Sequence, residues 1–276
     1  MQAPANETDY VLGHEPAELK RLAAQSDYWA EPTLELLTRA GIAPGMRVLD
    51  LGSGGGDVTF LAARMVGETG SVLGIDRSET AVAAAGRRAR EMSLNNVGFE
   101  TGNLDALNLD GRFDAVIGRL VLLYVAEPAR VLASVAKNLG ANGILAFLEM
   151  EMHSAHSVPD VPAFGQVHDW LIEGFRRAGT KTDLGPRLWR AFRDAGLPQP
   201  QMFAYAKMEA APAIAGTTLL VETLRSLLPM LEATGVVTAR ELQIDALAQR
   251  LQRALSEAQA TLVMPSMVGS WTRLSS

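Results

Sequence analysis

The chain has 276 residues, of which 48% are hydrophobic and 20% charged, so it can bury the core of one large domain with a sizeable elaboration. Its formal net charge is -6, which disfavours a nucleic-acid partner because an acidic surface repels phosphate. There is no cysteine, which excludes disulfides, cysteine-held metal clusters and thiol nucleophiles. With only four histidines, we expect no metal site.

No segment of the sequence has the pattern of a leader or a membrane span. Residues 1–8 lack the basic-then-apolar order of a signal peptide. The longest apolar run, residues 120–126, is far shorter than the ~20 residues that cross a bilayer. We therefore expect a cytoplasmic protein with no membrane partner.

Helical and extended patterns alternate along the first half of the sequence. Residues 15–40 carry apolar side chains at helical spacing, and a turn over 41–45 follows. The expected strands are 46–51, 71–75, 97–100, 113–116 and 144–148, and the expected helices are 57–66, 79–92 and 128–139, the last ended by Gly140. Apolar strands separated by amphipathic helices are typical of a parallel sheet covered on both faces, in an open doubly wound α/β domain.

In the second half of the sequence, helical patterns predominate over strand patterns. Helical spacing recurs over 160–178, 184–195, 216–234 and 238–260, with strand-like alternation over 200–208 and a last apolar run over 262–272. The two late helices are too long for a simple crossover, so we expect an α-helical cap. Ligands bind doubly wound sheets beyond the carboxyl ends of the strands, and we look for the chemistry there.

One segment carries most of the functional information. The sequence VLDLGSGGGDVTF, residues 48–60, ends a strand at Asp50 and Leu51, continues through four glycines and starts a helix near Asp57. Glycines allow a sharp turn and let a ligand lie against the backbone. The start of the helix adds free N–H groups, so this loop is a candidate binding site.

Two cofactor classes compete for this loop. A dinucleotide fingerprint needs a third glycine for close packing of the helix, but that position is Asp57 when counted from Gly52 and Thr59 when counted from Gly54. An acidic side chain near the turn would also repel a pyrophosphate. The spacing D-x-G-x-G-x-G instead suits a positively charged ligand without phosphate. An NAD(P)-dependent oxidoreductase is therefore the weaker alternative.

The loop resembles motif I of the class I S-adenosylmethionine-dependent methyltransferases, and further matches follow in the family's order. Gly74-Ile75-Asp76 ends the second strand, and Asn103-Leu104-Asp105 follows the third. Residues 113–124 resemble the fourth strand and its continuation, and residues 142–145 the turn before the fifth, although Asn142 and a missing proline depart from the family's Pro-Gly-Gly. The resemblance is strong over 47–150 and weak elsewhere. It implies a Rossmann-like, mostly parallel seven-stranded sheet with S-adenosylmethionine as cofactor and S-adenosylhomocysteine as product.

The same resemblance divides the chain into three parts. Residues 1–45 are expected to form an N-terminal helical lid, and residues 46–150 the cofactor-binding core. Residues 151–276 are expected to supply the last strands of the core together with an inserted helical cap for the substrate.

The resemblance also implies cofactor contacts. Asp50 either complements the cofactor's ammonium or caps the glycine loop. Asp76 is expected to accept hydrogen bonds from the ribose diol, and Asp105 lies near the adenine amino group or caps a helix. Arg119, in an apolar context, is expected to meet a carboxylate, either the cofactor's own or that of Asp50. The full expected set is Tyr10, Tyr28, Asp50, Gly52, Ser53, Gly54, Asp76, Arg77, Asn103, Leu104, Asp105 and Arg119.

Some members of this set have an equally good ordinary role. Arg77 either stacks on adenine or is solvated. Tyr10 and Tyr28 either line a segment that closes over the cofactor or pack within an N-terminal helix. The run Arg87-Arg88-Ala89-Arg90 is most simply a solvated helix face.

The catalytic group is less defined by the sequence. Positioning can supply much of the acceleration of an in-line displacement. A weakly acidic acceptor such as a phenol also benefits from a base. His153 and His156 follow the fifth strand and are candidates for that base, because a neutral imidazole accepts a proton near pH 7. Glu149 is a candidate contact to the substrate. A solvated surface position is the simpler alternative for both histidines.

The acceptor is expected to be a small, aromatic or heterocyclic molecule. Phe164, Trp170, Phe175, Trp189 and Phe192 in the cap, with several methionines, suit a flat apolar ligand, although ordinary helix packing explains them equally well. The methylated atom, O, N or C, is not encoded in any pattern. We expect bacterial specialised metabolism, and a homodimer is allowed. A protein that binds the cofactor without turnover is the other alternative.

Overall fold

The described residues of the computed structural model, 25, 27–107, 109 and 111–275, form two compact units. One unit, here the core unit, contains the described residues within 25–152, 183–206 and 265–275. The other, here the second unit, contains residues 153–182 and 207–264. The second unit is thus made by two insertions into the chain of the core unit.

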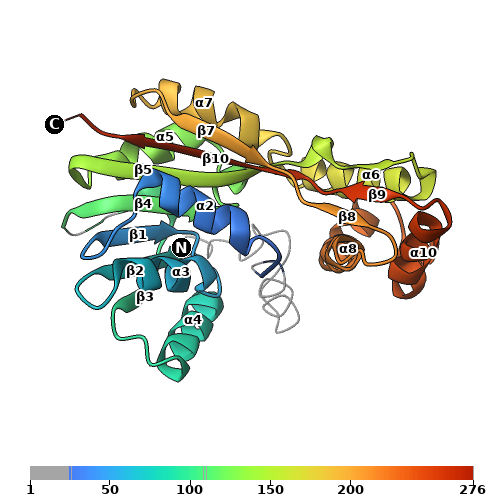
Figure 1. Ribbon diagram of the computed structural model, residues 1–276, viewed down its shortest axis with the longest axis horizontal. Coiled ribbons are helices and arrows are strands. Elements are labelled where there is room, and N and C mark those ends of the chain that lie inside the picture. The colour runs from blue at the N-terminus through green and yellow to red at the C-terminus, as the bar shows by residue number, and fades with distance from the viewer. Residues whose placement is uncertain (1–24, 26, 108, 110, 276) are drawn as a thin grey trace, which may run out of the picture. The chain divides into compact units, whose positions relative to one another are not determined.

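The core unit is built on a seven-stranded sheet (Figure 1). Its strands are β1 (Arg47–Leu51), β2 (Ser71–Asp76), β3 (Val97–Thr101), β4 (Phe113–Arg119), β5 (Leu139–Glu151), β7 (Gln201–Tyr205) and β10 (Ser266–Arg273). Their order is β3-β2-β1-β4-β5-β10-β7; β10 is antiparallel to both β5 and β7, and the other neighbouring pairs are parallel. The expectation of a doubly wound, mostly parallel seven-stranded sheet is confirmed.

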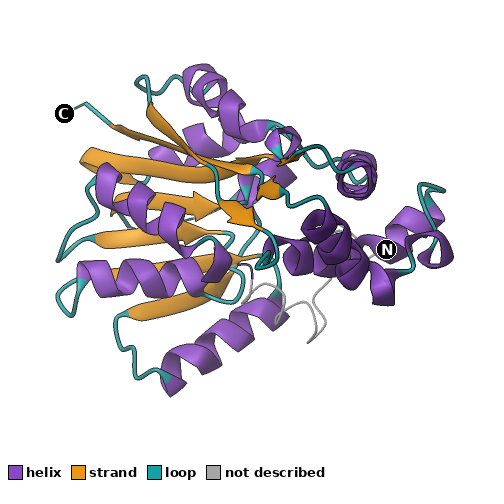
Figure 2. Ribbon diagram, turned by 45° about the vertical axis from the view of Figure 1, so that its right-hand side comes forward, coloured by secondary structure: helices purple, strands orange, loops and turns teal. Residues whose placement is uncertain are grey.

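Helices cover both faces of this sheet (Figure 2). The helices are α2 (Ala30–Ala40), α3 (Asp57–Val66), α4 (Glu79–Glu91), α5 (Pro128–Ala136) and α7 (Leu184–Asp194). Helix α3 packs beside α2, and α5 packs beside α7. Residues 144–148 of β5 are all fully buried, as expected for a central strand covered on both sides. The carboxyl ends of β1, β2 and β4 carry Asp50, Asp76 and Arg119, so the fold brings the predicted polar residues to one edge.

The second unit contains helices and a small sheet. Its helices are α6 (Pro162–Arg177), α8 (Gly216–Ala233), α9 (Ala239–Leu242) and α10 (Ile244–Glu257). Leucines 220, 224, 227, 231, 247, 251 and 255 make its core, with at most 7% exposure. The strands β6 (His156–Val158), β9 (Thr261–Val263) and β8 (Met208–Ala210) pair antiparallel in that order. The sequence predicted helices here but not this three-stranded sheet.

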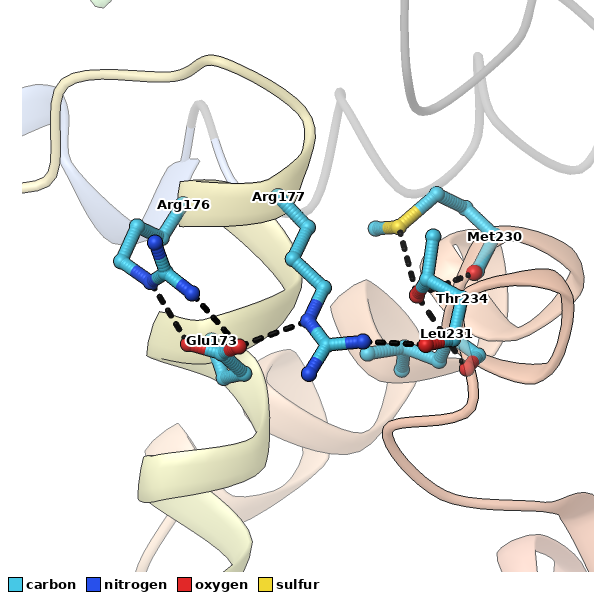
Figure 3. A network of polar contacts seen from close by, with 6 residues as sticks. All are labelled: Glu173, Arg176, Arg177, Met230, Leu231 and Thr234. Atoms are coloured by element: carbon cyan, nitrogen blue, oxygen red, sulfur yellow. Dashed lines mark hydrogen bonds and ion pairs between the residues drawn. The ribbon is translucent and has the colours of Figure 1, made fainter.

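A polar network joins two helices of the second unit (Figure 3). Glu173 of α6 accepts hydrogen bonds from Arg176 and Arg177, three and four residues later. The Arg177 guanidinium also donates to the carbonyl of Thr234, the C-cap of α8, while the Thr234 hydroxyl donates to the Met230 carbonyl at 2.8 Å. A cation near the end of a helix satisfies carbonyls that have no partner within the helix.

Several predicted boundaries are wrong. The helix expected over 238–260 is divided into α9 and α10 at Gln243, which has φ +49°. The helix expected over 128–139 ends at Ala136, and β5 already begins at Leu139 and contains Gly140, with a shift in its pairing to β4. The strand expected over 262–272 is two strands in different sheets, interrupted at Pro265, which has no N–H to donate. The strand expected over 200–208 is likewise divided between β7 and β8.

Candidate active site

The glycine loop after β1 is held by hydrogen bonds from its surroundings. The Ser53 N–H donates to the carbonyl of Ile75 at 3.0 Å, and the Gly56 N–H donates to the Ser53 carbonyl at 2.8 Å. The Gly54 N–H donates to Oδ2 of Asp76 at 2.8 Å. The end of β2 therefore fixes the shape of the loop without any ligand.

Two glycines of the loop differ in what surrounds them. Gly52 has φ +65°, and a Cβ there would lie 2.4 Å from Cγ2 of Val121, so only glycine fits. Gly54 has φ +50°, but a Cβ there would meet no protein atom within 4 Å. The backbone at Gly54 is thus open on the side where a side chain would project, as a loop that receives a ligand requires.

Asp76 lies at the end of β2 and supports two backbone segments. Its Oδ2 accepts the Gly54 N–H, and its Oδ1 accepts the Ser78 N–H at 2.9 Å. Each carboxylate oxygen can accept more than one hydrogen bond, so both oxygens retain capacity for hydroxyl donors. Ser78 in turn caps α4 through its hydroxyl, which accepts the Ala81 N–H at 3.2 Å.

Asp50 is a buried acid with one oxygen unused. Its side chain is 1% exposed, and Oδ2 accepts the Thr59 hydroxyl at 2.6 Å. Its Oδ1 has no hydrogen-bond partner among the described residues. Burial raises the pKa of Asp50 to about 7, against the lowering effects of Thr59 and Arg119. A buried carboxyl oxygen without a donor is costly, which favours a ligand cation at this point.

Arg119 links the end of β4 to the start of α2. Its Nη1 donates to the Thr33 hydroxyl at 3.0 Å, and that hydroxyl donates to the Trp29 carbonyl at 2.7 Å. Burial lowers the pKa of Arg119, while the negative charges of Asp57 and Asp50 raise it. Asp57 and Asp50 are thus among the carboxylates whose charge reaches Arg119.

The front segment is described only in part. Tyr28 packs edge-on against Trp29, with ring centroids 4.8 Å apart at 87°. Trp29, the N-cap of α2, is 1% exposed and Tyr28 is half-buried, so this pair packs at the start of α2. Tyr10 lies outside the described residues. Helix α2 itself begins at Ala30, so only part of the helix expected over 15–40 is described.

Arg88 contacts the glycine loop, although the sequence predicted only a solvated helix face for it. The expected solvated face does not include it: Nη1 donates to the Gly55 carbonyl and Nη2 to Asp57 at 2.7 Å. Its guanidinium also lies over the Phe60 ring, 5.2 Å from the centroid. Arg88 therefore ties α4 to the glycine loop and to the start of α3. No local signal distinguishes it from Arg87 and Arg90 in the sequence, because its partners are 31 to 33 residues away.

The remaining cofactor candidates follow the ends of β2 and β3. Arg77 comes directly after Asp76 and is exposed. Asn103 is exposed after β3, and Leu104 and Asp105 start the short 3-10 turn η2 (Leu104–Ala106). The fold thus brings these segments to the same edge of the sheet as the glycine loop.

The three catalytic candidates fall in different surroundings. Glu149, in the core unit, is fully buried, and Oε1 accepts the N–H groups of Val121 at 3.1 Å and Leu122 at 2.8 Å. Oε1 of Glu149 therefore serves the backbone, while Oε2 is buried with no hydrogen-bond partner among the described residues. His153 and His156 are exposed residues of the second unit. His153 Nε2 lies 2.9 Å from the Thr182 hydroxyl, and His156 Nδ1 lies 2.9 Å from the Ser154 carbonyl oxygen.

Two general properties complete the description of the site. Within the described ranges, no group of three or more histidine or acidic side chains is arranged to hold a metal ion. None of the described helices is long and apolar enough to span a membrane.

A family model described as a methyltransferase domain matches residues 42–181, half of the chain. Together with the seven-stranded fold and the glycine loop, this match places the chain in the family of class I S-adenosylmethionine-dependent methyltransferases.

Curated relatives match about half of this chain. The 2-phytyl-1,4-naphthoquinone methyltransferase of Synechococcus elongatus is 39% identical over 135 residues, which are 47% of this chain and 56% of that protein. The ubiquinone/menaquinone biosynthesis C-methyltransferase UbiE of Shewanella pealeana is 34% identical over 166 residues, 54% of this chain and 65% of that protein. The chain thus spans less than two thirds of the length of these relatives.

Solved structures share the fold at low sequence identity. The YcgJ protein of Bacillus subtilis has a TM-score of 0.59 at 16% identity, over 89% of this chain and 99% of that one. A phosphoethanolamine N-methyltransferase of Haemonchus contortus, in complex with S-adenosylhomocysteine, has a TM-score of 0.53 at 16% identity, over 89% of this chain and 52% of that one. At this identity the likeness concerns the fold alone.

Proposed function

We propose that this protein transfers a methyl group from S-adenosylmethionine to a small, apolar acceptor. The observation that carries the proposal is the acidic cradle at the edge of the core sheet. There a buried Asp50 with an unused oxygen stands behind an open glycine loop whose shape is held by Asp76. The family match and the S-adenosylhomocysteine complex of a structural neighbour support the same cofactor.

The residues of the cradle fit this cofactor. The unpaired Oδ1 of Asp50 suits the ammonium of its amino-acid end, because a cation removes the cost of the buried oxygen. Asp76 can accept the two ribose hydroxyls in addition to its backbone donors. The exposed Arg77 and Asn103, with Leu104 and Asp105, follow strands β2 and β3 and are proposed to border the adenine. Arg119 is proposed to face the cofactor's own carboxylate, and Tyr28 and Tyr10 are proposed to close over the cofactor's amino-acid end.

The proposed reaction requires the protein mainly to position the cofactor and the acceptor. When bound, S-adenosylmethionine would supply the methyl group of its sulfonium: the bond from the acceptor atom to the methyl carbon forms in line as the S–CH3 bond breaks, and S-adenosylhomocysteine is the leaving group. The chain's own task is to hold the cofactor rigidly and to exclude water, which can account for much of the acceleration. His156 is the better candidate of the two histidines for a base: Nδ1 faces the Ser154 carbonyl and must donate to it, which leaves Nε2 as the proton acceptor.

The acceptor class is proposed from the relatives. Both curated relatives carry quinones in their names, a naphthoquinone in one and ubiquinone or menaquinone in the other. A flat ring with an apolar substituent also agrees with the aromatic and methionine content of residues 151–276. We therefore propose a quinol, phenol or related heterocycle as the acceptor.

Calorimetric titration with S-adenosylmethionine, S-adenosylhomocysteine and NADH tests the proposal. Binding of the first two ligands and not the third is expected. Binding of NADH alone would overturn the proposal in favour of hydride transfer. Tight S-adenosylmethionine binding with no methyl transfer to a panel of quinols, phenols and indoles would instead identify a non-catalytic binder.

A further inference from the structure

The chain makes a strained elbow where β4 ends. We call residues 119–122 the β4 elbow. Leu120 has φ +52°, a left-handed conformation that a leucine rarely adopts. Its N–H donates to the Leu148 carbonyl of β5 at 2.9 Å. Such strain persists only where the surroundings hold it, and it concentrates at functional sites.

Glu149 holds the other side of the elbow. It is the residue after Leu148 in β5, it is fully buried, and its Oε1 accepts the N–H groups of Val121 and Leu122. These two N–H groups lead into the 3-10 turn η3 (Leu122–Tyr124), where the first donors of a helix have no partner within it. A single carboxyl oxygen thus fixes two consecutive peptide groups.

The β4 elbow in turn shapes the acidic cradle formed by Asp50, Asp76 and the glycine loop. A Cβ on Gly52 would lie 2.4 Å from Cγ2 of Val121, and a Cβ on Gly118 would lie 2.8 Å from Cγ1 of Val121. It therefore fills the space that both glycines leave. At the start of the elbow, Arg119 lies within the field of Asp50 and Asp57. A shift of the elbow would move both the wall behind Gly52 and the guanidinium.

We propose that Glu149 is a positioning residue for cofactor binding, which acts through the β4 elbow to place Val121 against the glycine loop and Arg119 beside Asp50. This inference rests on the proposed function. Its proposed role is indirect, because Oε1 accepts hydrogen bonds from the elbow's backbone.

The ionisation of Glu149 indicates which substitution preserves this role. Burial raises its pKa to about 8, although the N–H groups of Leu122, Val121 and Leu123 lower it in part. At neutral pH the carboxyl is therefore mostly protonated, and Oε1 acts as an uncharged acceptor. A glutamine offers the same acceptor in nearly the same shape, whereas a leucine offers none.

The test compares Glu149→Gln, Glu149→Leu and Leu145→Ala by titration with S-adenosylhomocysteine at a temperature where all are folded. Leu145 is buried in the same strand and pairs with Val116, away from the elbow. Its truncation therefore controls for a general loss of folding stability in Glu149→Leu. We expect Glu149→Leu to weaken binding about tenfold or more, Glu149→Gln to stay within about threefold, and Leu145→Ala to equal the wild type. Equal affinity of Glu149→Leu and wild type would overturn the inference, as would a loss in Leu145→Ala equal to that in Glu149→Leu.

A second variant keeps the test independent of folding. Val121→Ala removes the wall without touching the hydrogen bonds of Glu149, and we expect it to weaken S-adenosylhomocysteine binding by about threefold or more. Unchanged affinity would show that the elbow does not reach the cofactor. Hydrogen exchange gives a direct readout, because the Val121 and Leu122 amides should lose protection in Glu149→Leu and keep it in Glu149→Gln. If the wild type itself does not bind S-adenosylhomocysteine, the proposed function fails rather than this inference.

Discussion

The protonation of Asp50 should control cofactor affinity near neutral pH. Its pKa is raised to about 7 by burial, while its proposed ligand is an ammonium. Only the ionised carboxylate attracts that cation, so affinity should fall as the pH drops through 7. Other charges that act on Asp50 are those of Asp57, Asp76 and Arg119.

The size of the effect follows from the ionised fraction. With a pKa of about 7, roughly three quarters of the carboxyl is ionised at pH 7.5 and roughly 3% at pH 5.5. Because the apparent dissociation constant scales inversely with the competent fraction, binding of S-adenosylhomocysteine should weaken by about 25-fold across this range. The assay is calorimetric titration at half-unit intervals of pH, with circular dichroism at each pH to confirm that the protein stays folded.

Asp50→Asn provides the matched control. Its amide keeps an acceptor for Thr59 but has no charge, so its binding should be weaker at pH 7.5 and nearly independent of pH. A wild-type affinity that is flat between pH 5.5 and 7.5 would refute the reasoning. An equal pH dependence in Asp50→Asn would assign the effect to another group.

Other substitutions test the remaining parts of the site. Asp76→Ala should weaken S-adenosylhomocysteine binding by ~1.5–3 kcal/mol, the usual size of a lost charge-assisted hydrogen bond, and unchanged calorimetric affinity would exclude the ribose assignment. Arg88→Met should weaken S-adenosylhomocysteine binding severalfold, because it releases the Gly55 carbonyl and Asp57. The free energy of unfolding in urea should fall by less than ~1 kcal/mol, because the ion pair of Arg88 with Asp57 is partly exposed. As a control, Arg87→Met, at an exposed position of the same helix, should change neither the affinity nor the stability. The pKa of Glu149 is raised from 4.5 to about 8 in the folded state, so its contribution to stability is complete below pH 4.5 and is lost as the pH rises through 8. Between pH 5.5 and 7.5, the free energy of unfolding in urea should therefore fall by up to ~1.4 kcal/mol per pH unit more in the wild type than in Glu149→Gln. Parallel pH curves for the two proteins would contradict this. His153→Ala and His156→Ala should each leave S-adenosylhomocysteine affinity intact; a ~100-fold loss of turnover in one of them would identify the base, and a loss in neither would leave positioning as the source of the rate.

Much of the core unit follows from local pattern. The strands with continuous apolar runs, the glycine loop and Asp76 at a strand end are visible in the sequence, because burial on both faces and a sharp turn each demand particular residue types over a short span. The topology then places every such strand end at one edge, which is why the loop, Asp76 and Arg119 come together as expected. The local pattern gave wrong boundaries at Gly140 and Pro265, and it missed the breaks within 200–208 and 238–260.

Other features depend on contacts between distant parts of the chain. In the sequence Arg88 is one of three apparently solvated arginines. Only the packing of α4 on the sheet brings it to Asp57 and the Gly55 carbonyl. Glu149 reads as a substrate contact until β4 and β5 are paired, because its two donors lie 27 and 28 residues earlier in the chain. The sequence alone determined the residue types at the site and the strands that carry them. The roles of Arg88 and Glu149 were decided by tertiary structure, since a hydrogen bond depends on distance and burial, which sequence spacing does not specify across a sheet.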